Sequence, residues 1–284
     1  MLTRHGFTLV EAAVATVLTV LVSAMLVSLL LRGQSVIIFE RGRMEVQRTL
    51  RSGALFASYE WSGLTPGGGD LTALGRSWLQ YRGPRGLASS CAARTDAIIV
   101  RPDLRYGVRA WVAGRDSLLV YAAGDSVAGT VPRWEPLPLT GVAAGVCPDG
   151  SPGLTLRTII DSARLPLREV LRGTPVRLFE PMESRLYQSQ GAWWLGLRSL
   201  TGGGSIQPAL GPLTANGFEL RFHDLAGVPT TDPALAVAVT ATFRASTRPP
   251  VVQPWGRRPP PAGSSDSLVV ELVTRNARPL GTGP

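Results

Sequence analysis

A continuous apolar run lies near the start of the sequence. Residues 7–31 contain nineteen hydrophobic positions, five Thr or Ser, and a single charge at Glu11. As a helix rising about 1.5 Å per residue, the run measures roughly 37 Å, against about 30 Å for the hydrocarbon core of a bilayer. It predicts a helix that crosses a membrane with some tilt. A secretory signal peptide is the alternative, but such a peptide has a shorter apolar region followed by a small-residue cleavage site.

Beyond Arg32 the pattern becomes amphipathic. Apolar or small residues recur at three- and four-residue steps, with Arg48, Arg51 and Glu60 between them: Val46, Leu50, Gly53 with Ala54, Ala57 and Trp61. This period indicates one helix from about Phe7 to about Trp61 with a single apolar stripe in its second half. Each of Gly33, Gly42 and Gly53 weakens a helix by about 1 kcal/mol relative to Ala, so we expect bending or local melting there without a break.

After Pro66 the period changes to two. Short apolar runs rich in Val, Ile, Leu and aromatic residues alternate with Gly, Pro and Asp, which predicts a mostly antiparallel sheet. The candidate strands are 77–82, 97–101, 117–121, 154–160, 176–180, 185–188, 192–198, 218–223, 235–243 and 267–274. Residues 189–191 predict a hairpin turn, and residues 164–171 fit either a short helix or a strand. Six prolines within residues 248–266 predict a loop.

Composition excludes several chemistries. All 29 basic residues are Arg, which removes Walker A phosphate binding and Schiff-base catalysis. The sequence has two His and two Cys, so a four-ligand Cys/His zinc site would need all of them. His223 accompanies no nucleophile motif, and residues 224–232 lack EF-hand spacing, so ordinary turn chemistry is preferred over calcium binding. We predict no cofactor, no metal site and no enzymatic activity.

One motif lies at the start of the apolar run. The sequence reads MLTRHG over residues 1–6, then FTLVE over residues 7–11. A short basic leader, a glycine, an aromatic residue and an acid in front of a spanning helix resemble the class III signal of type IV prepilins and type II secretion pseudopilins. The resemblance implies cleavage between Gly6 and Phe7 by a membrane-embedded prepilin peptidase. It also implies methylation of the new amino group on Phe7.

A carboxylate in a membrane-spanning helix, such as Glu11, is stabilised by pairing with a cation. A carboxylate at the centre of a spanning helix costs roughly 2.5–3.5 kcal/mol on insertion scales, and less near a helix end. Cleavage before Phe7 creates an ammonium group one turn away, which is also available to Glu11 of a neighbouring subunit. Their attraction at about 4 Å approaches 4 kcal/mol at an effective dielectric constant of about 20, before desolvation. We therefore expect Glu11 to direct subunit assembly. The alternative is a helix-terminal acid that only complements the macrodipole.

The leader also predicts an orientation. Arg4 keeps the N-terminus in the cytoplasm while the large domain crosses the bacterial inner membrane, giving a single-pass precursor and then a periplasmic or cell-surface filament. In that compartment Cys91 and Cys147 are candidates for a disulfide closing a loop worth up to roughly 4 kcal/mol in the entropic picture. Two buried free thiols remain the alternative.

A second resemblance lies further along. Residues 174–200, with VRLFE, RLY and WWLGLR, are similar to the strand, hairpin and Leu-x-Arg core of PilW-like minor pilins and J-class minor pseudopilins. Residues 268–276, LVVELVTRN, resemble their final strand. The presence of Glu11 matches most subunits and departs from the tip-capping K class, which lacks that acid.

These observations predict an α+β protein with a pilin-like fold. We expect a cleaved leader (1–6), a membrane and filament-core helix (7–31), its amphipathic continuation (32–62), and a β-rich outer domain (63–284) with the proline-rich loop. The expected function is that of a minor pilin or minor pseudopilin, processed by prepilin peptidase and packed against other subunits. Two alternatives stay open. One is a pilin that binds DNA through surface Arg, although these are scattered; the other is an unrelated signal-anchored surface protein.

Overall fold

The computed structural model describes residues 8–107, 109–247 and 265–273. The chain divides into two compact units. Of the described residues, the first unit holds 8–48, 246–247 and 265–266, and the second holds 49–107, 109–245 and 267–273. Helix α1, Leu9–Trp61, contributes to both, because the unit that contains the sheet begins at Thr49 inside the helix.

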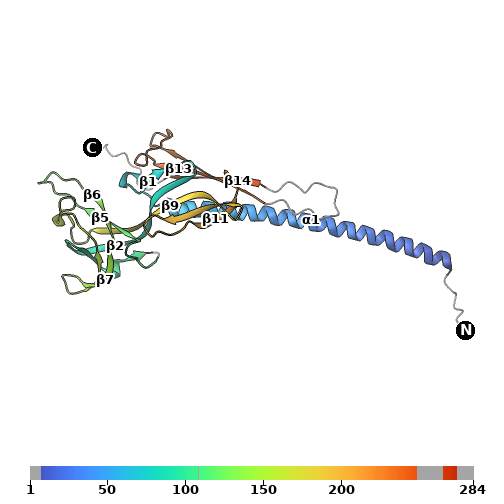
Figure 1. Ribbon diagram of the computed structural model, residues 1–284, viewed down its shortest axis with the longest axis horizontal. Coiled ribbons are helices and arrows are strands. Elements are labelled where there is room, and N and C mark those ends of the chain that lie inside the picture. The colour runs from blue at the N-terminus through green and yellow to red at the C-terminus, as the bar shows by residue number, and fades with distance from the viewer. Residues whose placement is uncertain (1–7, 108, 248–264, 274–284) are drawn as a thin grey trace. The chain divides into compact units, whose positions relative to one another are not determined.

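Helix α1 is one unbroken element of 53 residues (Figure 1). It ends at Trp61, as the hydrophobic period predicts, and the first proline of the sequence, Pro66, follows in the next turn. None of the three glycines interrupts the helix. A Cβ on Gly33 would meet no atom within 4 Å, whereas one on Gly42 would lie 3.1 Å from Thr247 Cγ2. Gly42 therefore permits a close approach of the chain that leaves the sheet.

The second unit is built on antiparallel strands. An eleven-stranded sheet has the order β11-β10-β9-β2-β3-β8-β7, with β1 and β4 paired to β2, β5 to β9, and β6 to β5. A three-stranded sheet has the order β12-β13-β14. The bounds are β1 Leu71–Leu74, β2 Trp78–Arg94, β3 Ala97–Val100, β4 Tyr106–Gly107, β5 Ser117–Ala122, β6 Arg133–Pro138, β7 Gly141–Val146, β8 Pro152–Arg157, β9 Pro175–Ser189, β10 Ala192–Ser199, β11 Gln207–Leu213, β12 Phe218–His223, β13 Ala238–Ser246 and β14 Ser265–Val273. One long helix followed by an antiparallel sheet domain is an α+β architecture, as predicted.

Two strands are longer than their sequence patterns predict. The pattern ends β2 at Arg82, because Gly83, Pro84 and Gly86 are typical of a turn; the strand instead continues through a bulge between Pro84 and Gly86. A Cβ on Gly86 would lie 2.6 Å from Trp111 Nε1, so the glycine admits the indole. β9 joins two predicted strands, since Glu183 and Ser184, which resemble a polar break in the sequence, are buried with partners on neighbouring strands.

Other expectations need correction. Five strands were not predicted, namely β1, β4, β6, β7 and β11; β6 and β11 each carry two prolines, and β7 is mostly Gly and Ala. β8 and β13 are displaced by two or three residues from the predicted ranges. Residues 164–171, whose pattern fits either a helix or a strand, contain a 3₁₀ turn at Leu167–Glu169. Residues 248–264 of the predicted loop 248–266 lie outside the described residues. Its last two residues, Ser265 and Asp266, begin β14.

The predicted hairpin turn is present between β9 and β10. Ser189 pairs with Ala192 across the two-residue loop Gln190–Gly191. Both loop residues have positive φ, 50° and 72°, which is the geometry of a type I′ turn. Gln190 is the only non-glycine with positive φ in the described chain.

The end of α1 is a core element of the second unit. Gly53, Ala57 and Trp61 are buried, as the amphipathic stripe predicts. A Cβ on Gly53 would lie 2.9 Å from Leu210 Cδ2 and 3.0 Å from Phe243 Cδ1, so the helix backbone contacts β11 and β13 directly. The Trp61 ring lies 6.0 Å from that of Phe218 on β12. A separate cluster of buried residues in this unit includes Ile98, Leu118, Leu156 and Leu178.

Candidate functional site

The first turn of α1 contains a capping box. Thr8 N–H donates to Glu11 Oε2 at 2.9 Å, and Thr8 Oγ1 donates to the same oxygen at 3.0 Å. Glu11 N–H in turn donates to Thr8 Oγ1 at 3.3 Å. These reciprocal bonds satisfy two backbone donors that the start of a helix leaves without partners. Glu11 therefore has a role within its own chain.

Thr8 is the partner that the sequence interpretation missed. Thr8 and Glu11 have the T-x-x-E spacing of a capping box, so the signal is present in the motif already singled out. In the described chain only Oε2 of Glu11 accepts hydrogen bonds, which leaves Oε1 available to a donor from another molecule. Gly6 and Phe7, the expected cleavage and methylation residues, lie outside the described residues.

The surface of α1 between Leu9 and Leu31 is apolar and exposed on every side. An 18-residue window of the helix has a mean hydropathy of 2.6 and no buried residue, and within the described residues α1 is the single helix long and apolar enough to cross a membrane. Its hydroxyl groups bond to its own backbone: Thr16 to Ala13 O at 2.8 Å, Thr19 to Ala15 O at 2.7 Å, and Ser28 to Met25 O at 2.8 Å. Polar side chains satisfied in this way are compatible with lipid or with another helix.

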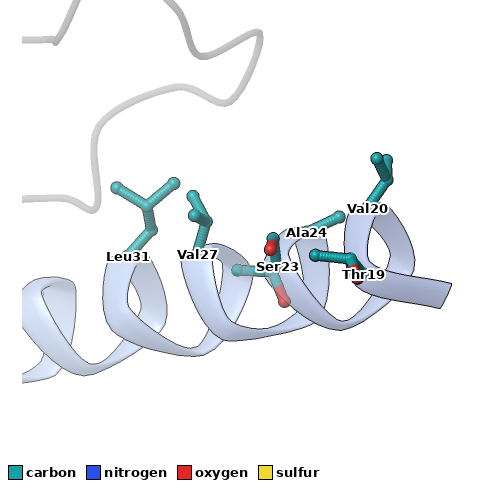
Figure 2. A pocket seen from close by; sticks show the side chains of 7 residues that line it. Thr19, Val20, Ser23, Ala24, Val27 and Leu31 are labelled. Carbon is teal, nitrogen blue, oxygen red and sulfur yellow. The ribbon is translucent and has the colours of Figure 1, made fainter. Parts of the chain in front are cut away.

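One face of this segment is slightly hollowed. Thr19, Ser23, Ala24 and Ser28 line a depression of about 540 Å³ together with three larger residues, Val20, Val27 and Leu31 (Figure 2). Small residues at such spacing allow close approach of a second helix.

Exposed apolar residues continue past the predicted end of the spanning run. Val36, Ile37, Ile38 and Phe39 are 44–60% exposed and occupy consecutive positions, so they surround the helix. Arg32, Gly33 and Gln34 separate these residues from the apolar run, so they form a second, shorter exposed apolar segment of the helix.

Cys91 and Cys147 form a disulfide in the structure, with their Cα atoms 5.7 Å apart. Cys91 is on β2 and Cys147 follows β7, two strands that are separated by β3 and β8 in the sheet order. Strands in a flat sheet lie about 4.8 Å apart, so three steps would place β2 and β7 about 14 Å from each other. The four strands must therefore curl to bring the two sulfurs together, and both cysteines are buried against Ile99.

A buried acid binds three arginines within the second unit. Glu180 on β9 accepts hydrogen bonds from Arg85 Nε at 2.9 Å, Arg109 Nη2 at 3.0 Å and Arg115 Nε at 2.5 Å. Burial raises the pKa of the Glu180 carboxyl, but hydrogen bonds from Arg115, Arg85, Ser199 and Arg109 outweigh it and lower this pKa to about 2. The carboxylate is saturated with donors, so it fixes the Arg109–Arg115 segment to the sheet.

The cluster around Glu180 also reaches the helix. Glu60 of α1 accepts a hydrogen bond from Tyr81 Oη at 3.1 Å and lies 3.9 Å from Arg85 Nη1. Burial, followed by the charge of Glu60, raises the pKa of the Tyr81 hydroxyl, which keeps it a neutral donor. The last turns of α1 are thus held by polar as well as apolar contacts.

The remaining candidate residues have local roles. Asp224 Oδ1 accepts hydrogen bonds from the backbone N–H groups of Ala226 and Val228, both at 2.9 Å, which closes the turn considered as a calcium loop. His223 ends β12 and forms an isolated bridge with Pro229. Across residues 8–107, 109–247 and 265–273, no group of three or more His, Cys, Asp or Glu side chains is arranged to hold a metal ion.

No protein family, curated protein or solved structure matches this chain. Its own sequence and geometry therefore carry the functional interpretation.

Proposed function

We propose that this chain is a prepilin-like subunit, a minor pilin or minor pseudopilin that acts by assembly and not by catalysis. The observation that carries the proposal is the start of α1, where a fully exposed apolar helix has a carboxylate in its first turn. The apolar surface of residues 9–31 is stable only against lipid or against other apolar helices. The sequence motif that precedes it supplies the resemblance to prepilins.

The helix then has two successive environments. In the precursor, residues 9–31 lie in the inner membrane with the N-terminus in the cytoplasm and the sheet domain outside. After cleavage, the same surface packs against neighbouring helices in the core of a filament. Head-to-tail contacts that do not close into a ring produce such an open helical array.

Glu11 has a place in both environments. Within its own chain it caps the helix through Oε2. The ammonium of a trimmed Phe7 on an adjacent subunit would donate to Oε1, which adds a charge-assisted bond in a medium of low dielectric constant. One carboxylate can make both bonds, because the cap uses Oε2 and the neighbour would use Oε1.

The alternative of a DNA-binding subunit draws little support from the second unit. Most arginines of its described residues lie within 4.0 Å of a carboxylate oxygen, among them Arg133 with Glu169, Arg177 with Asp70 and Arg198 with Glu183. Arginines neutralised by the protein's own acids release few counterions from a phosphate backbone.

The mass of the mature N-terminal peptide tests processing. We expect loss of residues 1–6 and gain of one methyl group in cells that contain prepilin peptidase, and an intact N-terminus in cells that lack it. The substitution Gly6→Val, which adds a branched side chain at the scissile bond, should give the intact form in both. Mature protein that keeps residues 1–6 in peptidase-containing cells contradicts the proposal.

Two substitutions then separate the roles of Glu11. Glu11→Gln keeps an oxygen acceptor for Thr8 but removes the charge, whereas Thr8→Ala removes the capping hydroxyl and keeps the charge. We expect Glu11→Gln to be cleaved normally and to enter filaments at least about tenfold less often, since the lost charge pair contributes over about 1.4 kcal/mol. Thr8→Ala should still be incorporated. Equal incorporation of Glu11→Gln and the unaltered chain argues against assembly through this charge.

A further inference from the structure

A pocket of about 300 Å³ lies on the larger sheet, remote in sequence from Glu11 and outside the proposed assembly surface. Its lining comes from β1, β2, β5, β6 and β9 and the residues beside them: Thr72, Tyr81, Arg82, Ser117, Pro136, Leu137, Pro138, Phe179 and Pro181. The strand registers explain the grouping, because Ser117 lies opposite both Pro138 and Phe179, and Arg82 lies opposite Pro181. Adjacent strands thus present prolines, aromatic rings and one guanidinium to the same space.

Arg82 is the charged residue of this lining, and its situation is unusual. Every other arginine in the described chain that is not exposed has a carboxylate oxygen within 4.0 Å; Arg82 has none. Asp70, whose charge acts on Arg82 without forming an ion pair, accepts hydrogen bonds through Oδ2 from Arg177 Nη2 at 2.8 Å and from Thr65 N–H at 3.0 Å, and its buried Oδ1 has no partner among the described residues. A partly buried cation with no carboxylate in contact is only partly compensated, so an anion from another molecule can complete its pairing.

The guanidinium is held in place but has donors to spare. Its Cζ atom lies 5.2 Å from the centroid of the Phe179 ring, and Nη1 donates to Gly68 O at 3.1 Å. A guanidinium has five N–H donors, and the described chain uses one of them. Burial and the neighbouring charge of Arg177 lower the pKa of Arg82 despite the opposing effect of Asp70, but the group stays protonated.

The chemistry of the pocket selects one class of ligand. A single planar guanidinium matches a carboxylate through two parallel hydrogen bonds, and the hydroxyls of Thr72 and Ser117 offer further polar contacts. Phe179 and the three prolines offer apolar surface beside that charge. We propose that this pocket binds a carboxylate borne on an aliphatic or aromatic group, which pairs with Arg82 while its apolar part packs on Phe179.

Binding by the full-length protein in a non-ionic detergent tests the proposal, measured by isothermal titration calorimetry. The probes are phenylacetate, its uncharged analogue 2-phenylethanol, and acetate. We expect phenylacetate to bind more tightly than both, because only it offers a charge and an apolar group together. Equal affinity of phenylacetate and 2-phenylethanol overturns the proposal.

Substitutions locate the binding. Arg82→Gln removes the charge and keeps a donor for Gly68 O; we expect it to lower the affinity for phenylacetate about tenfold. Arg94→Gln is the matched control, because Arg94 is an exposed arginine at the other end of the same strand, and it should bind as the unaltered protein does. Thr72→Trp fills the pocket from an exposed position while keeping Arg82, and we expect it to abolish the binding of phenylacetate. This variant tests the site if Arg82→Gln fails to fold. Unchanged binding by Thr72→Trp, or an equal loss with Arg94→Gln, rules the site out.

A peptide distinguishes the source of the carboxylate. An acetylated, amidated peptide with one glutamate between leucines competes with phenylacetate for the same site. Tighter binding of the peptide identifies an acidic segment of another protein as the ligand, and tighter binding of phenylacetate identifies a free small carboxylate. Either result supports the proposal, whereas binding of neither probe overturns it.

Discussion

The two ends of helix α1 carry apolar surfaces of different kinds. Between Leu9 and Leu31 the large apolar side chains surround the helix and are 52–87% exposed. Between Gly53 and Trp61 the helix buries one stripe against the sheet domain, where Ala57 and Trp61 are fully buried, while Leu55 and Tyr59 outside the stripe remain exposed. A stripe can be covered by a single neighbouring surface, but an apolar cylinder cannot. One end of the helix is therefore complete within the chain, while the other requires lipid or other subunits.

The largest expected effect is a difference in stability between substitutions at the two ends of the helix. Trp61→Ala should lower the free energy of unfolding by about 3–5 kcal/mol, because it leaves a cavity beside Phe56 and Phe218. The control is Leu26→Ala on the exposed end of the same helix, where we expect a change within about 0.5 kcal/mol. Urea unfolding of both variants in detergent measures the difference. Similar losses at the two positions would show that the exposed end is also packed within the chain.

The carboxylates Glu11 and Glu180 differ in the same way. Glu180 is fully bound by groups of its own chain, and the dependence of stability on pH measures that binding. The pKa of Glu180 is about 2 when folded, against 4.5 ordinarily, so its stabilisation is present above pH 4.5 and is lost as the pH falls towards 2. The loss amounts to about 3 kcal/mol in the free energy of unfolding, measured by urea titrations across this window.

Glu180→Gln is the variant that assigns this pH dependence. It should be less stable than the unaltered protein at pH 7, because three arginines lose a buried counter-charge. It should also lose the additional decline between pH 4.5 and 2. A variant that retains the full decline would place the titrating group elsewhere.

The smallest effect concerns the cap at the exposed end. Thr8→Ala should destabilise the first turn of α1 by about 1 kcal/mol, which is the usual contribution of a capping hydroxyl. Hydrogen exchange of the amides near Glu11, recorded in bicelles, should quicken about fivefold, with no change near Trp61. Thr8→Ser keeps the hydroxyl and should behave as the unaltered chain; faster exchange in both variants would point to something other than the cap.

Much of this contrast is predictable from the sequence. The apolar run and the three- and four-residue steps from Val46 to Trp61 predict one helix with two kinds of surface, because helical periodicity is a local property. The hairpin turn at residues 189–191 is likewise predicted from adjacent residues, and the structure adds its type I′ geometry. The capping box at Thr8 has an equally local signal in its spacing, but it was missed because the interpretation of Glu11 rested on charge alone.

Features that depend on contacts between distant segments were not predictable in this way. In the sequence, Pro84 is typical of the end of a strand, and only the structure shows the bulge beside the buried Trp111 that lets the strand continue. Glu183 is typical of a turn in the sequence, and only the structure shows that Arg198 binds it within the sheet. Arg82 looks like any other arginine of the sequence. That no carboxylate contacts it becomes visible only in the structure, where Asp70 binds Arg177 instead.

The sequence alone determined the helix, its apolar run, the acid in its first turn and the alternating pattern of the strands after Pro66, since each of these depends on residues a few positions apart. The tertiary structure decided the strand order, the convergence of three arginines on Glu180, the curl that joins Cys91 to Cys147, and the pocket at Arg82. These depend on which segments meet in space, and that is set by the packing of many side chains together and not by any local pattern.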